Sequence, residues 1–156
     1  PAFMALSFAG EGLPMLYNGQ EACNAKRLEF FEKDPIDWSQ GEGCTLGDLA
    51  SRLIAFRKAN PALGNGQWGA RMQQVVNDKP QQLFAWVRQQ DGNKVVGLFN
   101  LSEKPVSAQL ADGLAAGRYV DFADGSAIEL KAGTTVELPA WGYRLLSTGS
   151  STAPRD

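Results

Sequence analysis

The sequence predicts a mainly β fold with α-helices, in which a helical first part precedes an antiparallel β-sandwich. From residue 71 onward, short apolar runs alternate with turns rich in Gly and Asp, which is typical of sandwiches and barrels. Before residue 64 the apolar residues follow helical spacing or form short continuous runs. The change occurs near Gly64-Asn65-Gly66. We therefore divide the chain into residues 1–66, a sandwich at 67–147, and a small, polar tail at 148–156 that we expect to be disordered.

The first unit begins with an apolar helix over residues 2–9, which Gly10 ends. A helix with no polar face must be buried by another part of the protein. Residues 14–17 form a short apolar run without alternation, which favours a fully buried parallel strand. Helix, tight turn and buried strand together are typical of an α/β protein. Residues 20–44 lack periodicity and predict a long loop, a kind of segment that is often functional.

A second helix is predicted to start after Thr45, whose side chain is a candidate N-cap, and to end before Asn60-Pro61. Its apolar residues fall on one face: Leu46, Leu49, Ala50, Leu53 and Phe56. In the sandwich, Asp91-Gly92 and Asp124-Gly125 are hairpin-type turns. Strands are expected at 71–76, 83–88, 94–101, 105–110, 117–122, 127–130, 135–138 and 142–147.

Composition excludes several classes of function. The chain has 15 basic and 17 acidic residues, so no basic field attracts nucleic acid. The absence of histidine excludes histidine-based triads and histidine metal sites within the chain. The apolar stretch at the start is too short to cross a bilayer, and no signal peptide is recognisable. We expect no membrane partner and no cofactor.

The cysteines and the acidic residues of the long loop suggest no metal. Cys23 and Cys44 are isolated; a single bridge is possible, but free thiols are the favoured interpretation. Four loop carboxylates are candidate calcium ligands: Glu29, Glu32, Asp34 and Asp37. Their spacing does not match a Gly-containing calcium loop, so we expect no metal there, and we expect Asp37-Trp38 to anchor the loop onto the rest of the protein.

Four segments carry a resemblance to a known family. Residues 12–21, GLPMLYNGQE, resemble the G-x-P-x-x-Y-x-G-x-E segment of the α-amylase superfamily of glycoside hydrolases. In that family the segment marks the eighth strand of the (β/α)₈ barrel and the loop after it. Residues 30–38, FFEKDPIDW, and 53–63, LIAFRKANPAL, resemble the stretch before the last barrel helix and that helix itself. Residues 138–146, LPAWGYRLL, resemble the last strands of the family's C-terminal sandwich.

The resemblance implies that residues 1–66 are the C-terminal remnant of the catalytic barrel. The parent would be a retaining glycoside hydrolase that acts on α-glucosidic linkages of starch-like or maltooligosaccharide substrates. The family's catalytic carboxylates lie on earlier strands, so this chain has no catalytic residue and is predicted to be inactive alone. The exposed barrel remnant would favour self-association.

The resemblance also gives tentative substrate-binding residues at the barrel mouth: Tyr17, Gln20, Glu21 and Arg27. For three of them the structural role is the favoured interpretation: Glu21 as an acceptor for backbone amides or for an arginine, Tyr17 as a packed aromatic, and Arg27 as a solvated charge. For Gln20 a role as a loop brace is equally expected. The alternative function is a non-catalytic carbohydrate-binding module. In that case an aromatic face would stack on sugar, formed from Trp68, Trp86, Trp141 and Tyr143. Packing in the core or against a sheet face is the other role for these aromatic side chains.

Overall fold

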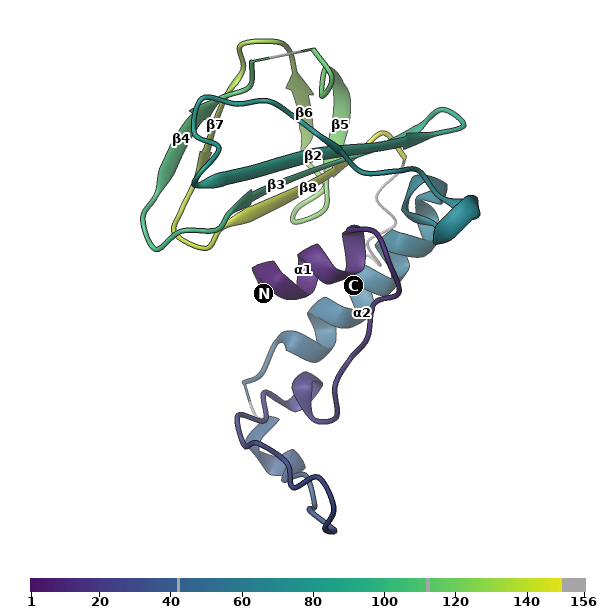
Figure 1. Cartoon of the computed structure of the whole chain (residues 1–156), viewed down its shortest axis with the longest axis vertical. Helices are drawn as coiled ribbons and strands as arrows, with labels where there is room; N and C mark the ends of the chain where they lie inside the picture. Colours follow the sequence, from purple (N-terminus) through teal and green to yellow (C-terminus); the bar gives the residue numbers. More distant parts are fainter. Residues whose placement is uncertain (42, 112, 150–156) are drawn as a thin grey trace.

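A computed structural model describes residues 1–41, 43–111 and 113–149 (Figure 1). The helices are α1 (Ala2–Ala9) and α2 (Leu46–Ala59), with 3₁₀ turns η1 (Gln20–Ala22), η2 (Trp38–Gly41), η3 (Pro61–Leu63) and η4 (Gly66–Trp68). The strands are β1 (Gln73–Gln74), β2 (Leu83–Gln90), β3 (Asn93–Asn100), β4 (Val106–Gln109), β5 (Gly117–Asp121), β6 (Ala127–Leu130), β7 (Thr135–Leu138) and β8 (Tyr143–Ser147). The predicted mainly β fold is confirmed, and every strand expected in the sandwich is present within a few residues of its predicted limits.

The strands form two antiparallel sheets that face each other. The larger sheet has the order β1-β2-β3-β8-β5-β6, and the smaller one pairs β4 with β7. The predicted turn at Asp91-Gly92 joins β2 to β3 with both residues at positive φ, as a tight hairpin requires. One core lies between the sheets, and all of its buried members come from residues 75–146.

The second core lies on the outer face of the six-stranded sheet, which α1 and α2 cover (Figure 1). Along β3, Val96 and Leu98 belong to the core between the sheets, whereas Val95 and Phe99 pack against the helices. Successive strand side chains point to opposite faces. Because both faces are buried, the central strands lack the polar alternation of a half-exposed sheet.

The centre of this helix-covered face is the buried indole of Trp86 on β2. It stacks at 6.3 Å on Phe99, which in turn stacks at 5.7 Å on Tyr143. The neighbouring position on β3 is Gly97, where a Cβ would lie 2.2 Å from Cε2 of Trp86. A glycine is therefore required at this point to give the indole room.

Buried Arg88 on β2 ties the sheet to the first part of the chain. Its guanidinium donates to the carbonyl oxygens of Gly10 at 2.8 Å, Ala9 at 3.2 Å, Gly64 at 2.7 Å and Ala70 at 2.8 Å. Two of these carbonyls lie at the C-terminal end of α1, where a positive charge is favourable. Burial lowers the pKa of Arg88, so the four acceptors together hold a cation that water no longer solvates.

A buried polar cluster forms a further tie between α2 and the sandwich. Asn60 follows α2, receives a hydrogen bond from Ser147 on β8, and accepts another from Asn93 at 2.8 Å. Arg52 on α2 donates to the carbonyl oxygen of Phe122 at 2.7 Å and lies over its ring. The helical part and the sandwich are thus joined by specific polar contacts as well as by apolar packing.

Two expectations for the local structure are changed, and a third falls mostly outside the described residues. Residues 14–17 form no strand in the described structure, and Leu13, Met15 and Tyr17 are exposed, because a strand needs neighbouring strands for its backbone hydrogen bonds. Thr45 precedes α2 but makes no side-chain cap hydrogen bond; only its carbonyl accepts, from the Leu49 amide. Of the tail, residues 150–156 lie outside the described part of the chain.

Candidate functional site in the loop between the helices

The long loop between α1 and α2 is held with little apolar burial. From residue 24 to residue 43, no residue whose exposure is described is buried as a whole. The loop turns sharply at Gly19, whose φ of 80° suits glycine. A Cβ at this position would lie 2.9 Å from Cβ of Asn24, so the close approach of the loop to itself also requires glycine.

A hollow of about 470 Å³ opens at this turn. Its lining is an aromatic ring, three side-chain amides, an ammonium group, a leucine, an alanine and a cysteine: Tyr17, Asn18, Gln20, Asn24, Lys26, Leu46, Ala25 and Cys23. Gln20 accepts a hydrogen bond from the Tyr17 amide at 3.2 Å, and Asn24 accepts one from the Lys26 amide at 3.1 Å. Both amide side chains are thereby oriented, with their NH₂ groups left as donors.

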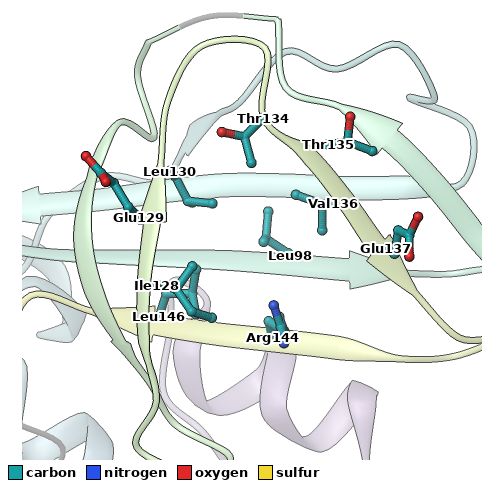
Figure 2. Close-up of a pocket in the computed structure, with 10 residues that line it drawn as sticks. All are labelled: Leu98, Ile128, Glu129, Leu130, Thr134, Thr135, Val136, Glu137, Arg144 and Leu146. Carbon is teal, nitrogen blue, oxygen red and sulfur yellow. The ribbon is translucent and has the colours of Figure 1, made fainter.

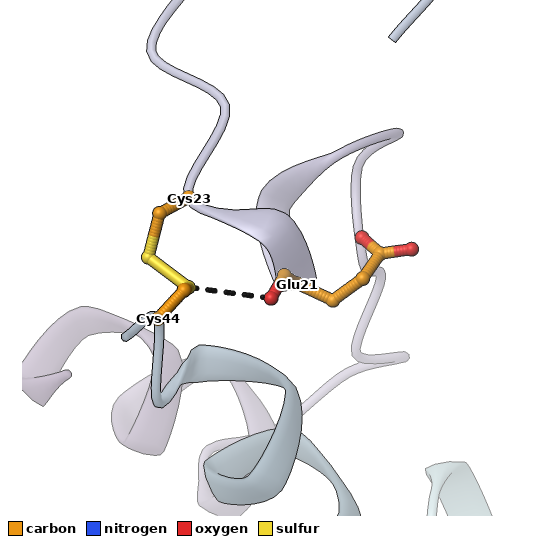
Figure 3. Close-up of a disulfide and its surroundings, with 3 residues drawn as sticks. All are labelled: Glu21, Cys23 and Cys44. Carbon is orange, nitrogen blue, oxygen red and sulfur yellow. Dashed lines mark hydrogen bonds between the residues drawn. A yellow bond between two sulfur atoms is a disulfide. The ribbon is translucent and has the colours of Figure 1, made fainter. Parts of the chain in front are cut away.

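The four predicted site residues separate into two pairs. Tyr17 and Gln20 line the hollow together, whereas Glu21 and Arg27 do not. Arg27 is exposed, as expected for a solvated charge. The Glu21 side chain extends away from the disulfide (Figure 3), and its Oε2 atom is buried without a hydrogen-bond partner in the described structure. Asn18, Asn24 and Lys26 were not predicted, because sequence spacing does not reveal how a loop without periodicity folds back.

The expectation of free thiols is wrong: Cys23 and Cys44 form a disulfide, with Cα atoms 5.8 Å apart (Figure 3). The loop folds back and brings its two ends together, which separation in sequence could not reveal. The Cys44 sulfur lies 3.3 Å from the Glu21 carbonyl oxygen, the contact drawn as a dashed line. Because a disulfide sulfur carries no proton, we interpret this as a sulfur–oxygen contact and not as a hydrogen bond.

Two of the four acidic side chains of the loop, those of Asp34 and Asp37, bind other loop residues. Asp34 pairs with Lys26 and accepts from the Glu29 amide at 3.0 Å. The Lys26 ammonium holds the pKa of Asp34 below its ordinary value. Asp37 accepts from the backbone and hydroxyl groups of Ser39. Across the described residues, no group of three or more metal-binding side chains gathers in one place.

A second hollow, of about 440 Å³, opens between β6 and β7 (Figure 2). Its floor is apolar, with Leu98 and Leu146 beneath Val136 and Ile128. Polar and charged groups stand around it: Glu129, Thr134, Thr135, Glu137 and Arg144. No aromatic side chain is among its lining residues, so it offers no ring on which a sugar could stack.

The four aromatic residues considered for a sugar-binding sandwich do not form one face. Trp86 is buried and Tyr143 half-buried beneath the helices, as the packing interpretation predicts. Trp68 and Trp141 are exposed by 73% and 50%. Trp141 instead pairs with Phe3 of α1 at 6.3 Å.

Comparison with known proteins agrees with this architecture. Residues 72–145 match the model of the maltogenic amylase C-terminal domain. The matched residues span most of the sandwich, so this part of the chain is similar to that domain. Curated proteins give no sequence match to the chain.

Solved structures of the α-amylase family share the fold. A maltogenic α-amylase, AmyB, from Thermotoga neapolitana aligns with a TM-score of 0.76 and 16% identity, over 94% of this chain and 35% of that one. The α-amylase of Geobacillus thermoleovorans, solved with acarbose, gives 0.67 and 17%, over 94% and 32%. The maltogenic amylase from S. marinus gives 0.68 and 20%, over 94% and 19%. The chain thus spans about a third or less of these proteins. No described helix has both the length and the apolar character needed to cross a membrane.

Proposed function

We propose that the chain is the C-terminal part of a retaining glycoside hydrolase that acts on α-glucosidic linkages of starch-like or maltooligosaccharide substrates. Residues 1–66 supply the end of a (β/α)₈ barrel, and the sandwich is a packing domain without catalytic carboxylates. The observation that carries this proposal is the double burial of the six-stranded sheet, which has the sandwich core on one face and α1 and α2 on the other. A free-standing binding module needs no such helical cover.

The fold match over 94% of the chain supports the same interpretation, because it includes the helical part as well as the sandwich. Relatives of this fold have been solved with maltose, maltotriose and acarbose. The hollow at Tyr17 and Gln20 has the chemistry for such ligands, since sugar hydroxyls pair with amide groups and sugar rings rest on aromatic faces. The disulfide favours folding in an oxidising compartment, where such bonds persist.

The exposed apolar residues of the first unit suit a missing part of the barrel. Leu13, Met15, Phe30 and Phe31 are exposed by 83%, 74%, 88% and 90%. Exposed apolar surface of this kind promotes association, so the isolated chain is expected to self-associate through it. In the parent, barrel strands and helices would cover the same side chains.

The test is a titration of the ¹⁵N-labelled chain with maltoheptaose, paired with a chromogenic maltooligosaccharide assay. We expect amide shifts at Tyr17, Gln20 and Asn24, their loss in Gln20→Ala but not in the exposed control Gln73→Ala, and no turnover. Shifts confined to the indoles of Trp68 and Trp141 would favour the binding-module alternative. Turnover that Glu21→Gln abolishes would mean a self-contained catalytic site, which contradicts the proposal.

A further inference from the structure

We infer that the Cys23–Cys44 disulfide is a reducible lock on the hollow that binds maltooligosaccharide, an inference that rests on the proposed function of that hollow. Its position supports this role. Cys23 itself lines the hollow, and Cys44 lies two residues before Leu46, which also lines it at the start of α2. The bond therefore ties the turn that carries Cys23 to the helix that carries Leu46. Cys23 is exposed, so a reductant in solution can reach it.

Apolar burial adds little to this hold on the loop. Between the two cysteines no residue of described exposure is buried as a whole, and no apolar side chain there belongs to either core, so apolar packing supplies little ordering energy. The polar contacts of the loop join loop residues to one another: Lys26 to Asp34, Glu29 to Asp34, and Ser39 to Asp37. None of these three contacts connects the loop to α2. The disulfide is the covalent connection that does so.

The Lys26–Asp34 pair is a weak substitute for that connection. Lys26 lines the hollow, and its side chain remains 59% exposed while it contacts Asp34, whose side chain is 7% exposed. Because the lysine end of the pair lies in solvent, salt and water screen the attraction, and such pairs contribute only modestly. Once the disulfide is reduced, this ion pair alone therefore holds the part of the loop around Lys26 only weakly.

Reduction of the disulfide would loosen the turn whose side-chain amides, those of Gln20 and Asn24, line the hollow. A dithiol gives two electrons and two protons to the bond, so that Cys23 and Cys44 become thiols and the dithiol becomes a disulfide. Opening a ring with a sequence separation of 21 residues lowers the equilibrium constant for the ordered loop by up to about 300-fold in the chain-entropy relation. A ligand that binds only the ordered loop then loses apparent affinity in proportion to the ordered fraction.

The test compares the oxidised chain, the chain reduced with dithiothreitol, and the double variant Cys23→Ser/Cys44→Ser. The Kd for maltoheptaose is measured by titration, and hydrogen exchange is followed at the amides of residues 24–41. We expect both ring-opened forms to bind at least tenfold more weakly and to exchange faster in the loop. Lys33→Ala, an exposed loop change that keeps the disulfide, should bind within about twofold of the parent.

The possible outcomes distinguish a failure of the proposed redox role of the disulfide from a failure of sugar binding at the hollow. Equal affinity and equal loop exchange in oxidised and reduced chains would overturn the lock and leave the sugar-binding hollow standing. Loop exchange that speeds up in a chain that binds no maltoheptaose in any state would overturn sugar binding at this hollow, and the lock with it. Two titratable thiols in the denatured, unreduced chain would show that the bond does not form.

Discussion

Replacing Arg88 with methionine tests how strongly the sheet is tied to the helical part. Arg88 is 1% exposed and donates four hydrogen bonds to backbone carbonyls at 2.7–3.2 Å. Methionine keeps most of the aliphatic volume but leaves the four carbonyls without this donor. Hydrogen bonds from a charged group contribute about 1.5–3 kcal/mol each, which sums to about 6 kcal/mol or more before desolvation is considered.

The desolvation of the buried cation opposes this gain by several kcal/mol, a term that the lowered pKa of Arg88 reflects. We therefore expect Arg88→Met to lower the free energy of unfolding by about 3 kcal/mol. Urea unfolding would be followed by circular dichroism at 222 nm for the helices and by tryptophan fluorescence for Trp86. Because two of the lost bonds join β2 to the C-terminal end of α1, the helical signal should be lost at lower urea concentration than in the parent.

The matched control is Arg118→Met on β5, where the arginine is exposed. Surface changes of this kind usually stay within about 0.5 kcal/mol. If the two variants differ in stability by less than about 1 kcal/mol, the assigned role of Arg88 as a tie between sheet and helices is refuted.

Three other expectations follow from the two cores. Gly97→Ala should lower the melting temperature by several degrees because the new methyl group meets the Trp86 ring, while Gly113→Ala, where the space is open, should leave it nearly unchanged. Burial raises the pKa of Tyr119 to about 12, whereas in the unfolded chain the hydroxyl loses its proton near pH 10. The free energy of unfolding is therefore unaffected by Tyr119 below pH 10 and should fall by up to about 3 kcal/mol between pH 10 and 12. Tyr119→Phe should flatten that part of the stability–pH curve, and an unchanged slope would contradict the assignment. A chain of residues 67–149 should still unfold cooperatively, because it contains the whole core between the sheets, but light scattering should detect association through its uncovered outer face; a chain with no circular-dichroism transition would disprove the domain boundary.

The sandwich could be predicted strand by strand because its signals are local. Asp91-Gly92 and Asp124-Gly125 specify turns, and the intervening runs are too short for helices. The buried face of α2 was predicted in the same way: Ala50, Leu53 and Phe56 repeat at helical spacing and are buried. Local signals do not show which other element packs on a given face of a helix or strand. The packing of α1 on β2 and β3 therefore became clear only from the structure.

The candidate site shows the same limit. Tyr17 and Gln20 belong to a recognisable segment and do line a hollow, but Asn24 and Lys26 reach it only because the loop doubles back. The disulfide was missed for the same reason, since the two cysteines meet by a fold of the loop that leaves no periodic trace. Residues 14–17 carry the apolar pattern of a buried strand, but pairing also requires neighbouring strands, which the described residues do not supply.

The two buried faces of the central strand β3 have a consequence for how this domain varies among relatives. Val96 and Leu98 face the smaller sheet, while Val95, Gly97 and Phe99 face the helices. Substitutions at the first set must be matched within the sandwich, and those at the second set by changes in α1 and α2. A chimera that joins this sandwich to another relative's helices should therefore fold only if the residues of the second set are exchanged together with the helices. The first set can stay as it is.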